Sequence, residues 1–370
     1  MFKKYKLRDF NFILALSVIV LMVLGVFLIN SADSSFTIKQ AVGVAMAVVI
    51  IIVVSLVDYH LWLNLYLLVY GVGIFFLLAV LFFGNTVNNA TRWFTLGGIT
   101  FQPSELAKPA MIIFMAALLQ RLVEEDKVSR IKGLLLFAGS VAVPTFLIFR
   151  QPDLSTTLCL VIVMILMLYL AGLSYKVIFI ALLILIPAAS IFIWYIQQPD
   201  QKLLNPYQVE RIMSFINPSD YIENNLQQLN SVMAIGSGQL WGKGLNPGPD
   251  VVTVSSSRMI SEQQTDFIFS VIGESFGFVG SIFVIAIILL IVLQCIRVSR
   301  RAKDTGGMLL AGGAACLFAI QSFINIGVAT AVLPNTGIPL PFISYGLTSL
   351  LSSAILIGVV LNVGMQPERY

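Results

Sequence analysis

The residues of this sequence that could do chemistry are charged side chains that stand beside long apolar segments. Asp266 is the clearest of them, because it directly precedes the apolar run that begins Phe267-Ile268-Phe269. Apolar surroundings disfavour the charged form of a carboxyl group, which suits a general base. A helix cap formed by Asp266 or Thr265 is the alternative. An aspartate next to aromatic membrane residues is costly to keep, so we favour a functional role.

A second charged group lies where a polar segment enters another apolar run. Glu105 and Lys108 are three residues apart, so they share a helix face and can form an ion pair. Arg92 and Gln102 lie just upstream, and the prolines of this segment favour a kink. A buried ion pair that only fixes helix packing is an equally good interpretation of Glu105 and Lys108.

Two further segments hold polar residues between apolar runs. Asp153 ends the tight turn that starts at Arg150, and a cap for the following helix is its favoured role. Residues 333–346 combine three prolines and two glycines, which excludes a regular helix. This segment is either a re-entrant loop that lines a site, with Ser344 and Tyr345 as candidates, or a plain loop outside the membrane.

Residue counts and spacing exclude other chemistries. His60 is the only histidine, and the three cysteines lie in apolar stretches, so zinc sites, disulfide frameworks and histidine-dependent nucleophiles are not expected. Residues 236–244 look like a phosphate-binding loop. However, Ser237 and Gly244 occupy the positions where a Walker A motif requires glycine and serine or threonine, so we reject nucleotide binding.

The amino-acid composition indicates the class of protein that carries these charged residues. Of the 370 residues, 58% are hydrophobic and 11% are charged, and the mean hydropathy is +0.94. Soluble domains have about 25% charged residues, so a soluble enzyme, a disordered chain and a nucleic-acid binder are excluded. The sequence predicts an all-α polytopic integral membrane protein.

Ten apolar stretches have the length of a transmembrane helix. They cover residues 10–29, 41–57, 61–83, 105–122, 134–149, 154–173, 177–196, 267–296, 308–333 and 346–364. The eighth is longer than a bilayer requires, so part of it should project or tilt. We interpret residues 1–370 as a single membrane domain.

The distribution of positive charge predicts the orientation. Fourteen of the 22 lysine and arginine residues fall on one side of the membrane. Four of the eight others lie in a single long loop, where the positive-inside rule says little. Both termini are therefore expected in the cytoplasm. The long loop, residues 197–265 between the seventh and eighth helices, is then extracytoplasmic, and its aromatic residues favour folding onto the membrane surface.

Together these segments resemble one family, the SEDS membrane glycosyltransferases of bacterial cell-wall synthesis, of the RodA, FtsW and SpoVE type. The matching pieces are Arg92-Trp93, Phe101 to Lys108, Gln151 to Leu154, Gln228 to Gly244, Thr265 to Phe269, Gly277 to Gly280, Asn335 to Gly337 and Pro341 to Gly346. The sequence departs from the family where Leu347 and Thr348 replace a glycine and a serine. It departs again where Ser275 follows Glu274, because two acidic residues are common there.

The resemblance implies that the chain polymerises lipid II into glycan strands at the outer face of the bacterial cytoplasmic membrane. The donor would be the strand on undecaprenyl pyrophosphate, and the acceptor another lipid II. Asp266 would be the catalytic carboxylate. Polar residues in and beside the matching pieces are expected to bind substrate, namely Arg92, Gln102, Glu105, Lys108, Asp153, Glu262, Ser344 and Tyr345. A class B penicillin-binding protein, a transpeptidase, is the expected partner.

The residue types suit that chemistry. A carboxylate can deprotonate the acceptor hydroxyl, and Arg92 and Lys108 could place positive charge on the departing pyrophosphate. A carboxylate could instead hold Mg²⁺ or Mn²⁺ on the pyrophosphate, and the sequence does not separate these two roles. No other cofactor is expected. The alternative function is a lipid II flippase or another membrane transporter, but transport sites lie near the membrane midplane and these charges gather near the outer interface.

Overall fold

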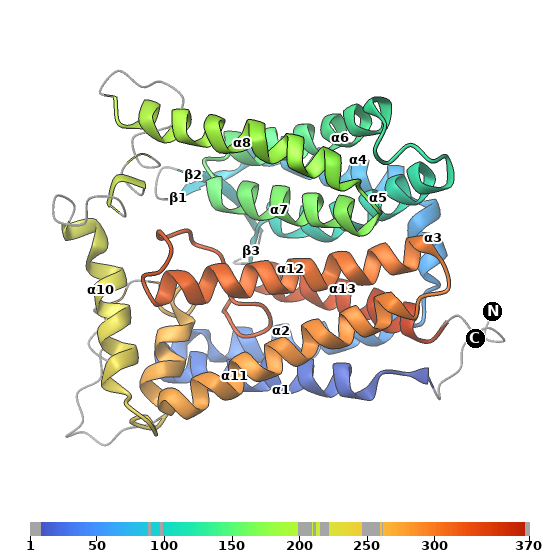
Figure 1. Cartoon of the computed structure of the whole chain (residues 1–370). Coiled ribbons are helices and arrows are strands. Elements are labelled where there is room, and N and C mark those ends of the chain that lie inside the picture. Colours follow the sequence, from blue (N-terminus) through green and yellow to red (C-terminus); the bar gives the residue numbers. More distant parts are fainter. Residues whose placement is uncertain are drawn as a thin grey trace.

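The computed structural model describes residues 9–87, 90–96, 99–198, 209, 212–214, 222–245, 260 and 262–366. In these residues the chain forms a bundle of long helices that run side by side (Figure 1). The helices are α1 (Phe12–Ala32), α2 (Thr37–Ser55), α3 (Tyr59–Asn64), α4 (Tyr66–Phe83), α5 (Pro103–Glu124), α6 (Ile131–Arg150), α7 (Leu154–Leu170), α8 (Tyr175–Ile196), α10 (Ile222–Ser237), α11 (Ile268–Arg300), α12 (Thr305–Ala329) and α13 (Leu347–Gly364).

The multi-pass membrane fold is confirmed, because each of the ten expected spans contains a long helix. Among the described residues, eight helices are long and apolar enough to cross a membrane, and α7 is a shorter apolar helix of 17 residues. Helix α8 runs over 22 residues. Many large apolar side chains of the outer helices are exposed, as expected where lipid surrounds the protein.

The structure adds two local features to the expected pattern. The third span, expected over residues 61–83, is divided at Leu65 into α3 and α4. Between α4 and α5 lies a small antiparallel sheet of β1 (Asn85–Val87), β2 (Ala90–Leu96) and β3 (Ile99–Phe101), in which β2 pairs with both neighbours. Strands this short are hard to distinguish from a loop by their apolar pattern.

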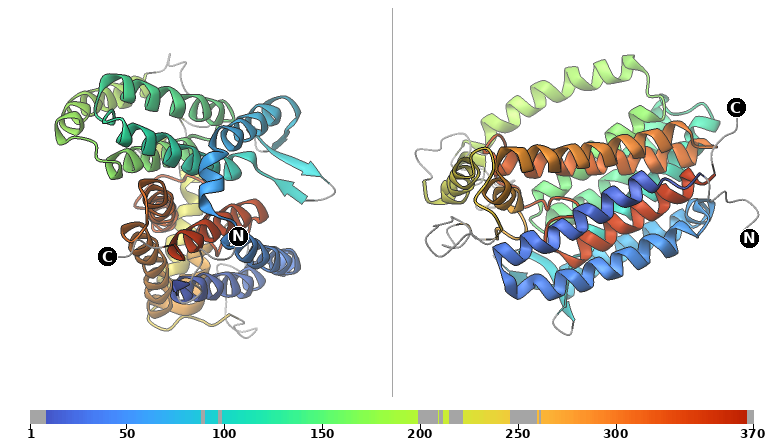
Figure 2. Two further views of the ribbon diagram at one scale, coloured as in Figure 1. Left: turned by 90° about the vertical axis from the view of Figure 1, so that its right-hand side faces the viewer. Right: turned by 90° about the horizontal axis from the view of Figure 1, so that it is seen from below.

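Helices α5, α12 and α13 form the centre of the bundle, and most of their side chains are buried. Helix α12 packs against α5, α7 and α11, while α13 packs against α2 (Figure 2). Small residues allow this close approach. A Cβ atom at Gly313 of α12 would lie only 2.8 Å from the sulfur of Met167 and 2.9 Å from Ile112.

Helix α10 runs across one end of the bundle, and α1 begins and α13 ends at the opposite end (Figure 1). Helix α10 packs against α11 and α12. The start of α1 and the end of α13 therefore lie together, on the side of the bundle away from α10. Much of the loop expected over residues 197–265 lies outside the described residues.

The eighth span is long because it contains two helical pieces. Helix α11 covers 33 residues, but Gly277 within it has φ 66° and ψ −162°, which no helix can contain. A positive φ with this ψ is open essentially to glycine alone. The break therefore separates a short first piece, residues 268–276, from the long second piece, residues 278–300.

The segment between α12 and α13 is a re-entrant loop, so the plain-loop alternative is wrong. Its residues Ile338, Leu340, Phe342 and Ile343 are 0–3% exposed. The Ile343 carbonyl oxygen lies against Gly25 of α1, where a Cβ atom would be 2.7 Å from it. Gly25 precedes the outer end of α1 by seven residues, so the loop reaches about 10 Å into the bundle.

At the end of the bundle opposite α10, polar side chains join α3, α12 and α13. His60 lies between two carboxylates, with Nδ1 2.7 Å from Asp58 Oδ1 and Nε2 3.0 Å from Asp304 Oδ2. The Tyr59 hydroxyl donates to the same Asp304 oxygen at 2.5 Å, and the other Asp304 oxygen caps α12. Asn362 of α13 accepts a hydrogen bond from the Tyr59 backbone at 2.9 Å. Asp304 is thus the shared partner of this junction.

We expect Asp304→Ala to destabilise the protein, since it removes a helix cap together with the partners of Tyr59 and His60. The cap alone contributes about 1 kcal/mol. The measurement is the thermal unfolding midpoint of the purified protein in detergent. Glu125→Gln is the control, because it breaks only an exposed ion pair with Lys127 and should leave the midpoint unchanged. Equal midpoints for Asp304→Ala and wild type would contradict the shared-partner role.

Asp58 should make this junction sensitive to acid. Burial alone would raise the pKa of Asp58, but hydrogen bonds from His60 bring it below its ordinary value of 3.8. A carboxylate whose folded-state pKa is lowered stabilises the fold above its unfolded pKa, and that contribution is lost as the pH falls through the folded-state pKa. Asp58→Asn should therefore lower the unfolding midpoint at about pH 7, and its difference from wild type should shrink below about pH 3.5. A difference independent of pH would contradict this expectation.

Candidate functional site

Asp266 lies at the end of the bundle that α10 crosses, directly before α11. The N-cap position of α11 belongs to Phe267 and receives no side-chain hydrogen bond, so the capping alternative for Asp266 is wrong. The Asp266 side chain is partly buried, whereas Phe267 and Ile268 after it are fully buried. Asp266 therefore lies between a turn that begins at the exposed Glu262 and a buried helix.

Asn325 of α12 holds the backbone of Asp266. Its Nδ2 atom donates to the Asp266 carbonyl at 2.8 Å and to the Ile338 carbonyl of the re-entrant loop at 2.8 Å. Both amide hydrogens are used, so the orientation of this 1% exposed side chain is fixed. Asn325 was not among the site residues expected from the sequence. The available signal was a face of Gln321 and Asn325, polar residues four apart inside an apolar helix.

The re-entrant loop also binds the residues just before Asp266. The Ser344 hydroxyl donates to the Thr265 carbonyl at 2.6 Å and accepts from the Leu340 N–H at 2.8 Å. The Tyr345 N–H donates to the Gln264 carbonyl at 2.8 Å. Ser344 and Tyr345 thus lie beside the residues that precede Asp266, and they hold the two segments together. Substrate binding by either side chain stays a prediction.

Glu262 starts the turn that leads to Asp266. It has a positive φ of 57°, and its carbonyl accepts hydrogen bonds from the N–H groups of Thr265 and Asp266 at 3.1 and 3.2 Å. Its side chain is exposed. Gln263 beside it is buried and donates to the Ala32 carbonyl at the end of α1, at 2.9 Å. Glu262 therefore lies on the solvent side of the same turn, close to Asp266.

Glu105 and Lys108 form the expected ion pair in the first turns of α5. Lys108 Nζ is 2.7 Å from Glu105 Oε1, and both residues are only 3% exposed. Glu105 Oε2 is buried and has no hydrogen-bond partner among the described residues. A buried carboxylate oxygen without a donor is costly, so Glu105 Oε2 is an unusual feature of this turn.

Arg92 on β2 contacts the turn between α6 and α7. Its guanidinium donates to the carbonyl oxygens of Gln151 (2.9 Å) and Pro152, and lies 3.9 Å from the Asp153 carboxylate. Asp153 is buried and caps α7 by accepting the Thr156 N–H at 3.1 Å. The capping role of Asp153 is therefore confirmed, and the same carboxylate faces Arg92.

Gln102 links the start of α5, which carries Glu105 and Lys108, to the segment beside Asp266. Its backbone N–H donates to Thr348 Oγ1 at 3.2 Å, which connects the start of α5 to the start of α13 just after the re-entrant loop. Thr348 retains the hydroxyl that the family has there as serine. Leu347 is accommodated because Gly43 of α2 has no side chain. A Cβ atom at Gly43 would lie 3.2 Å from Leu347 Cδ1.

The expected site residues thus form two groups at the outer end. Glu262, Asp266, Ser344 and Tyr345 lie around the start of α11, and Arg92, Glu105, Lys108 and Asp153 lie around the start of α5 and α7. In the described residues no cluster of three histidine, cysteine or acidic side chains could hold a metal ion. The carboxylates of the described site residues are therefore separate from one another and do not form a metal-binding cluster.

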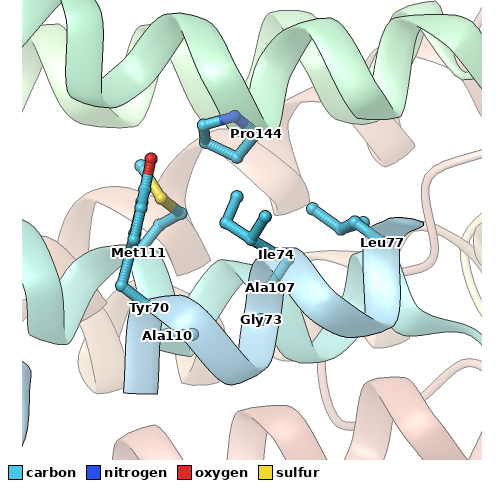
Figure 3. A pocket seen from close by; sticks show the side chains of 8 residues that line it. All are labelled: Tyr70, Gly73, Ile74, Leu77, Ala107, Ala110, Met111 and Pro144. Carbon is cyan, nitrogen blue, oxygen red and sulfur yellow. The ribbon is translucent and has the colours of Figure 1, made fainter. Parts of the chain in front are cut away.

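A small apolar pocket lies between α4, α5 and α6, beside the Glu105–Lys108 turn (Figure 3). Its cavity volume is about 10 Å³, which is about the space of one water molecule. It is lined by Tyr70, Gly73, Ile74, Leu77, Ala107, Ala110, Met111 and Pro144. The Tyr70 hydroxyl donates to the Ser140 carbonyl at 3.0 Å, so the lining has no free acid or base. The pocket is therefore a small packing gap between the three helices.

Comparison with known sequences reveals similarity over nearly the whole chain. The family model FtsW/RodA/SpoVE, described as cell cycle protein, matches residues 7–369. A probable peptidoglycan glycosyltransferase FtsW of Geobacter sp. (strain M18) is 32% identical over 374 residues, which cover 97% of each chain. Peptidoglycan glycosyltransferase MrdB of Escherichia coli (strain K12) is 31% identical over 352 residues, which cover 95% of this chain and 91% of MrdB.

Solved structures share the fold. A chain from a study of how a peptidoglycan synthase complex coordinates polymerization and crosslinking has a TM-score of 0.79 and 25% identity, covering 96% of this chain and 97% of that one. The Thermus thermophilus rod shape determining protein RodA has a TM-score of 0.69 and 23% identity, covering 96% of each chain. The likeness to RodA extends to the fold alone.

The contacts of Asn325 predict a local loss of stability when its amide is removed. Asn325→Leu keeps a similar volume but leaves two buried carbonyls without a donor, at a cost of about 1–3 kcal/mol each. We expect a lower thermal midpoint than in Phe323→Leu, which changes a side chain on the exposed face of the same helix. Equal midpoints for these two variants would show that Asn325 does not hold the Asp266 segment.

Proposed function

Because the chain belongs to the FtsW/RodA/SpoVE family, we propose that it is a peptidoglycan glycosyltransferase that polymerises lipid II into glycan strands. The observation that carries this proposal is the state of Asp266. Its carboxylate does not cap a helix, and its backbone is held by Asn325 of α12. The re-entrant loop holds the residue before it through Ser344. A fixed, partly buried carboxylate at the membrane surface is what a general base requires.

In the proposed reaction, Asp266 takes the proton from the acceptor sugar hydroxyl as that oxygen attacks the anomeric carbon of the donor. The bond from this carbon to the pyrophosphate oxygen breaks, and undecaprenyl pyrophosphate leaves with inversion at the carbon. One glycosidic bond forms for each phosphate ester bond broken. The fixed depth of both lipid-linked substrates in the membrane supports this geometry, since orientation alone lowers the barrier greatly.

The group around Glu105 supports binding of the sugar-pyrophosphate head. Lys108 and Arg92 bring positive charge to the outer end of the bundle, where a departing pyrophosphate needs it. Both cations are already near protein acceptors, Glu105 for Lys108 and the Gln151–Asp153 turn for Arg92. Glu105 Oε2 adds a buried acceptor for a hydroxyl or amide N–H of the substrate. Gln102 is proposed to transmit these contacts to the Asp266 side through Thr348.

A lipid-linked substrate also needs an apolar surface for its tail. The pocket between α4, α5 and α6 adjoins Ala107, which lies between Glu105 and Lys108 in sequence (Figure 3). The pocket itself is too small for a tail segment, so the exposed apolar side chains of α4 and α6 around it are the proposed surface for a polyprenyl chain whose pyrophosphate lies at the ion pair. Contacts with the tail would then bring the head to the same depth on each cycle.

A divalent cation fits this chain only as an ion that arrives with the pyrophosphate. Magnesium commonly binds through one or two carboxylates plus substrate phosphates. Asp266 and the neighbouring Glu262 supply carboxylates of that number, whereas the described residues contain no cluster of three ligands. Mg²⁺ or Mn²⁺ would add positive charge to the leaving group. The residues of this chain would orient the acceptor and accept its proton.

We further propose where the protein works and with what. The multi-pass fold and the charge distribution support the bacterial cytoplasmic membrane, with Asp266 facing outward. The structurally similar chain belongs to a complex that combines polymerization with crosslinking. That similarity supports a crosslinking partner for this chain, a transpeptidase of the class B penicillin-binding proteins.

The test is glycan polymerisation by the purified full-length protein from labelled lipid II, separated on a gel. Asp266→Asn should reduce strand formation at least ~10²-fold, because it removes the proton acceptor while keeping the shape of the side chain. Its unfolding midpoint should match wild type. Reactions with Mg²⁺, Mn²⁺ or a chelator, each with and without the partner transpeptidase, define the conditions for activity.

Asp33→Asn is the matched control. It makes the same chemical change at the outer end of α1, where asparagine can still accept the Ser35 N–H as aspartate does. Wild-type activity is expected from Asp33→Asn. Strands of normal length from a folded Asp266→Asn protein would refute the role of Asp266. No strands from wild type in any condition would favour lipid II flipping, to be measured in liposomes.

A further inference from the structure

The glycine-rich segment 236–244, which resembles a phosphate-binding loop, packs against the break in α11. Residues 238–244, here called the glycine loop, follow α10 and lie against the break in α11 at Gly277. We infer that the ion pair between Lys243 and Glu274 positions Asp266. Through it, the glycine loop sets the orientation of the short first piece of α11. This inference rests on the proposed function, because it concerns the same carboxylate.

The glycine loop replaces the hydrogen bonds that the break removes. In a continuous helix the N–H groups of Phe278 and Val279 would bond to the carbonyls of Glu274 and Ser275. Instead Phe278 and Val279 donate to the carbonyls of Gln239 (2.8 Å) and Leu240 (3.2 Å) of the loop. The freed carbonyls of Glu274 and Ser275 accept from the N–H groups of Lys243 and Gly244, both at 2.9 Å. Two helical bonds are exchanged for four bonds to the loop.

The exchange requires backbones in direct contact, which explains the glycines. A Cβ atom at Gly238 would lie 2.0 Å from the Gly273 carbonyl oxygen, and one at Gly242 would lie 2.3 Å from the Ser275 carbonyl oxygen. A Cβ atom at Gly277 would lie 2.4 Å from the backbone nitrogen of Gly242. No side chain fits at these positions, and Gly242 also has a φ of 77°.

An ion pair locks the side chains at the same place. Lys243 Nζ is 3.0 Å from Glu274 Oε1, and the Glu274 side chain is only 2% exposed. Ser237, at the end of α10, faces the same Glu274 oxygen at 3.4 Å. Glu274 therefore contacts the residue before the glycine loop and a residue near its end. Because a buried carboxylate is costly unless it is paired, removing the Lys243 charge should loosen this contact.

The position of Asp266 depends on the contacts of the glycine loop because the first piece of α11 is short. Residues 268–276 are held near Asp266 by Asn325 and the re-entrant loop, and at the other end by the glycine loop. Gly277 interrupts the helical conformation between them and the rest of α11. Helix α10 is itself anchored, since Gln228 and Ser231 donate to carbonyl oxygens at the end of α12. The glycine loop thus connects the helical piece that follows Asp266 to α10, which is itself anchored on α12.

The experiment measures kcat and the KM for lipid II in the full-length protein, together with the unfolding midpoint. Displacement of a catalytic group by about 1 Å costs ~10²-fold in rate, so Lys243→Gln should lower kcat ~10- to 100-fold and change KM little. Lys243→Arg, which keeps the charge, should retain most of kcat. Lys39→Gln is the control, because Lys39 is an exposed outer lysine remote in sequence from the loop. It should behave as wild type.

A covalent cross-link separates positioning from direct contact with substrate. The Lys243 N–H to Glu274 carbonyl bond of 2.9 Å brings the two backbones within the range of a disulfide. Lys243→Cys combined with Glu274→Cys should be impaired when reduced and should recover on oxidation, because the bond restores the link without the charge. Oxidised wild type controls for the native cysteines, of which Cys159 and Cys295 are buried. This variant also covers the case in which Lys243→Gln folds poorly.

Each outcome decides the question. Recovery of kcat by the disulfide would establish Lys243 as a positioning residue. Formation of the disulfide without recovery would overturn the inference and show that the lysine charge itself acts on the substrate. Wild-type kinetics in Lys243→Gln would overturn it as well. Failure of the proposed function is distinguishable, because wild type would then form no strands and Asp266→Asn would equal wild type.

Discussion

Irregular backbone inside a membrane must find its hydrogen-bond partners within the protein, and this structure depends on that requirement at two places. The break in α11 at Gly277 exposes two N–H groups and two carbonyls, which the glycine loop satisfies. The re-entrant loop before α13 is satisfied by Asn325, Gln264 and Thr265. Without water, each unpaired group would cost several kcal/mol. The two irregular segments therefore cannot move independently of their partners.

These two irregular segments enclose the short piece of chain that begins at Asp266. The re-entrant loop and α12 hold its start, and the glycine loop holds its end at Gly277. A membrane helix that ran unbroken from Asp266 would place the carboxylate by its own tilt alone. Breaking the helix transfers control of this position to α12 and to α10, and α10 lies across the end of the bundle where the substrates would meet. The cost is a set of glycines that tolerate no side chain.

Local features of the site were predictable, and distant partnerships were not. The Glu105–Lys108 pair and the Asp153 cap each lie within one helical turn, so spacing predicts both. Asn325 was missed because its partner Asp266 lies 59 residues away in sequence. The Lys243–Glu274 pair was missed for the same reason, with a separation of 31 residues. Glycine-rich residues 236–244 were assigned no role, because their function lies in what their backbone touches.

The sequence by itself determined the class of protein, its ten apolar spans and the acidic and basic residues at their outer ends. It could do so because apolar length, charge distribution and short spacings are properties of the chain alone. Only the tertiary structure decided that α11 breaks at Gly277, that the proline-rich segment enters the bundle against Gly25, and that Thr348 meets Gln102. Each of these depends on which distant backbone groups come into contact, and no local pattern in a sequence encodes such a contact.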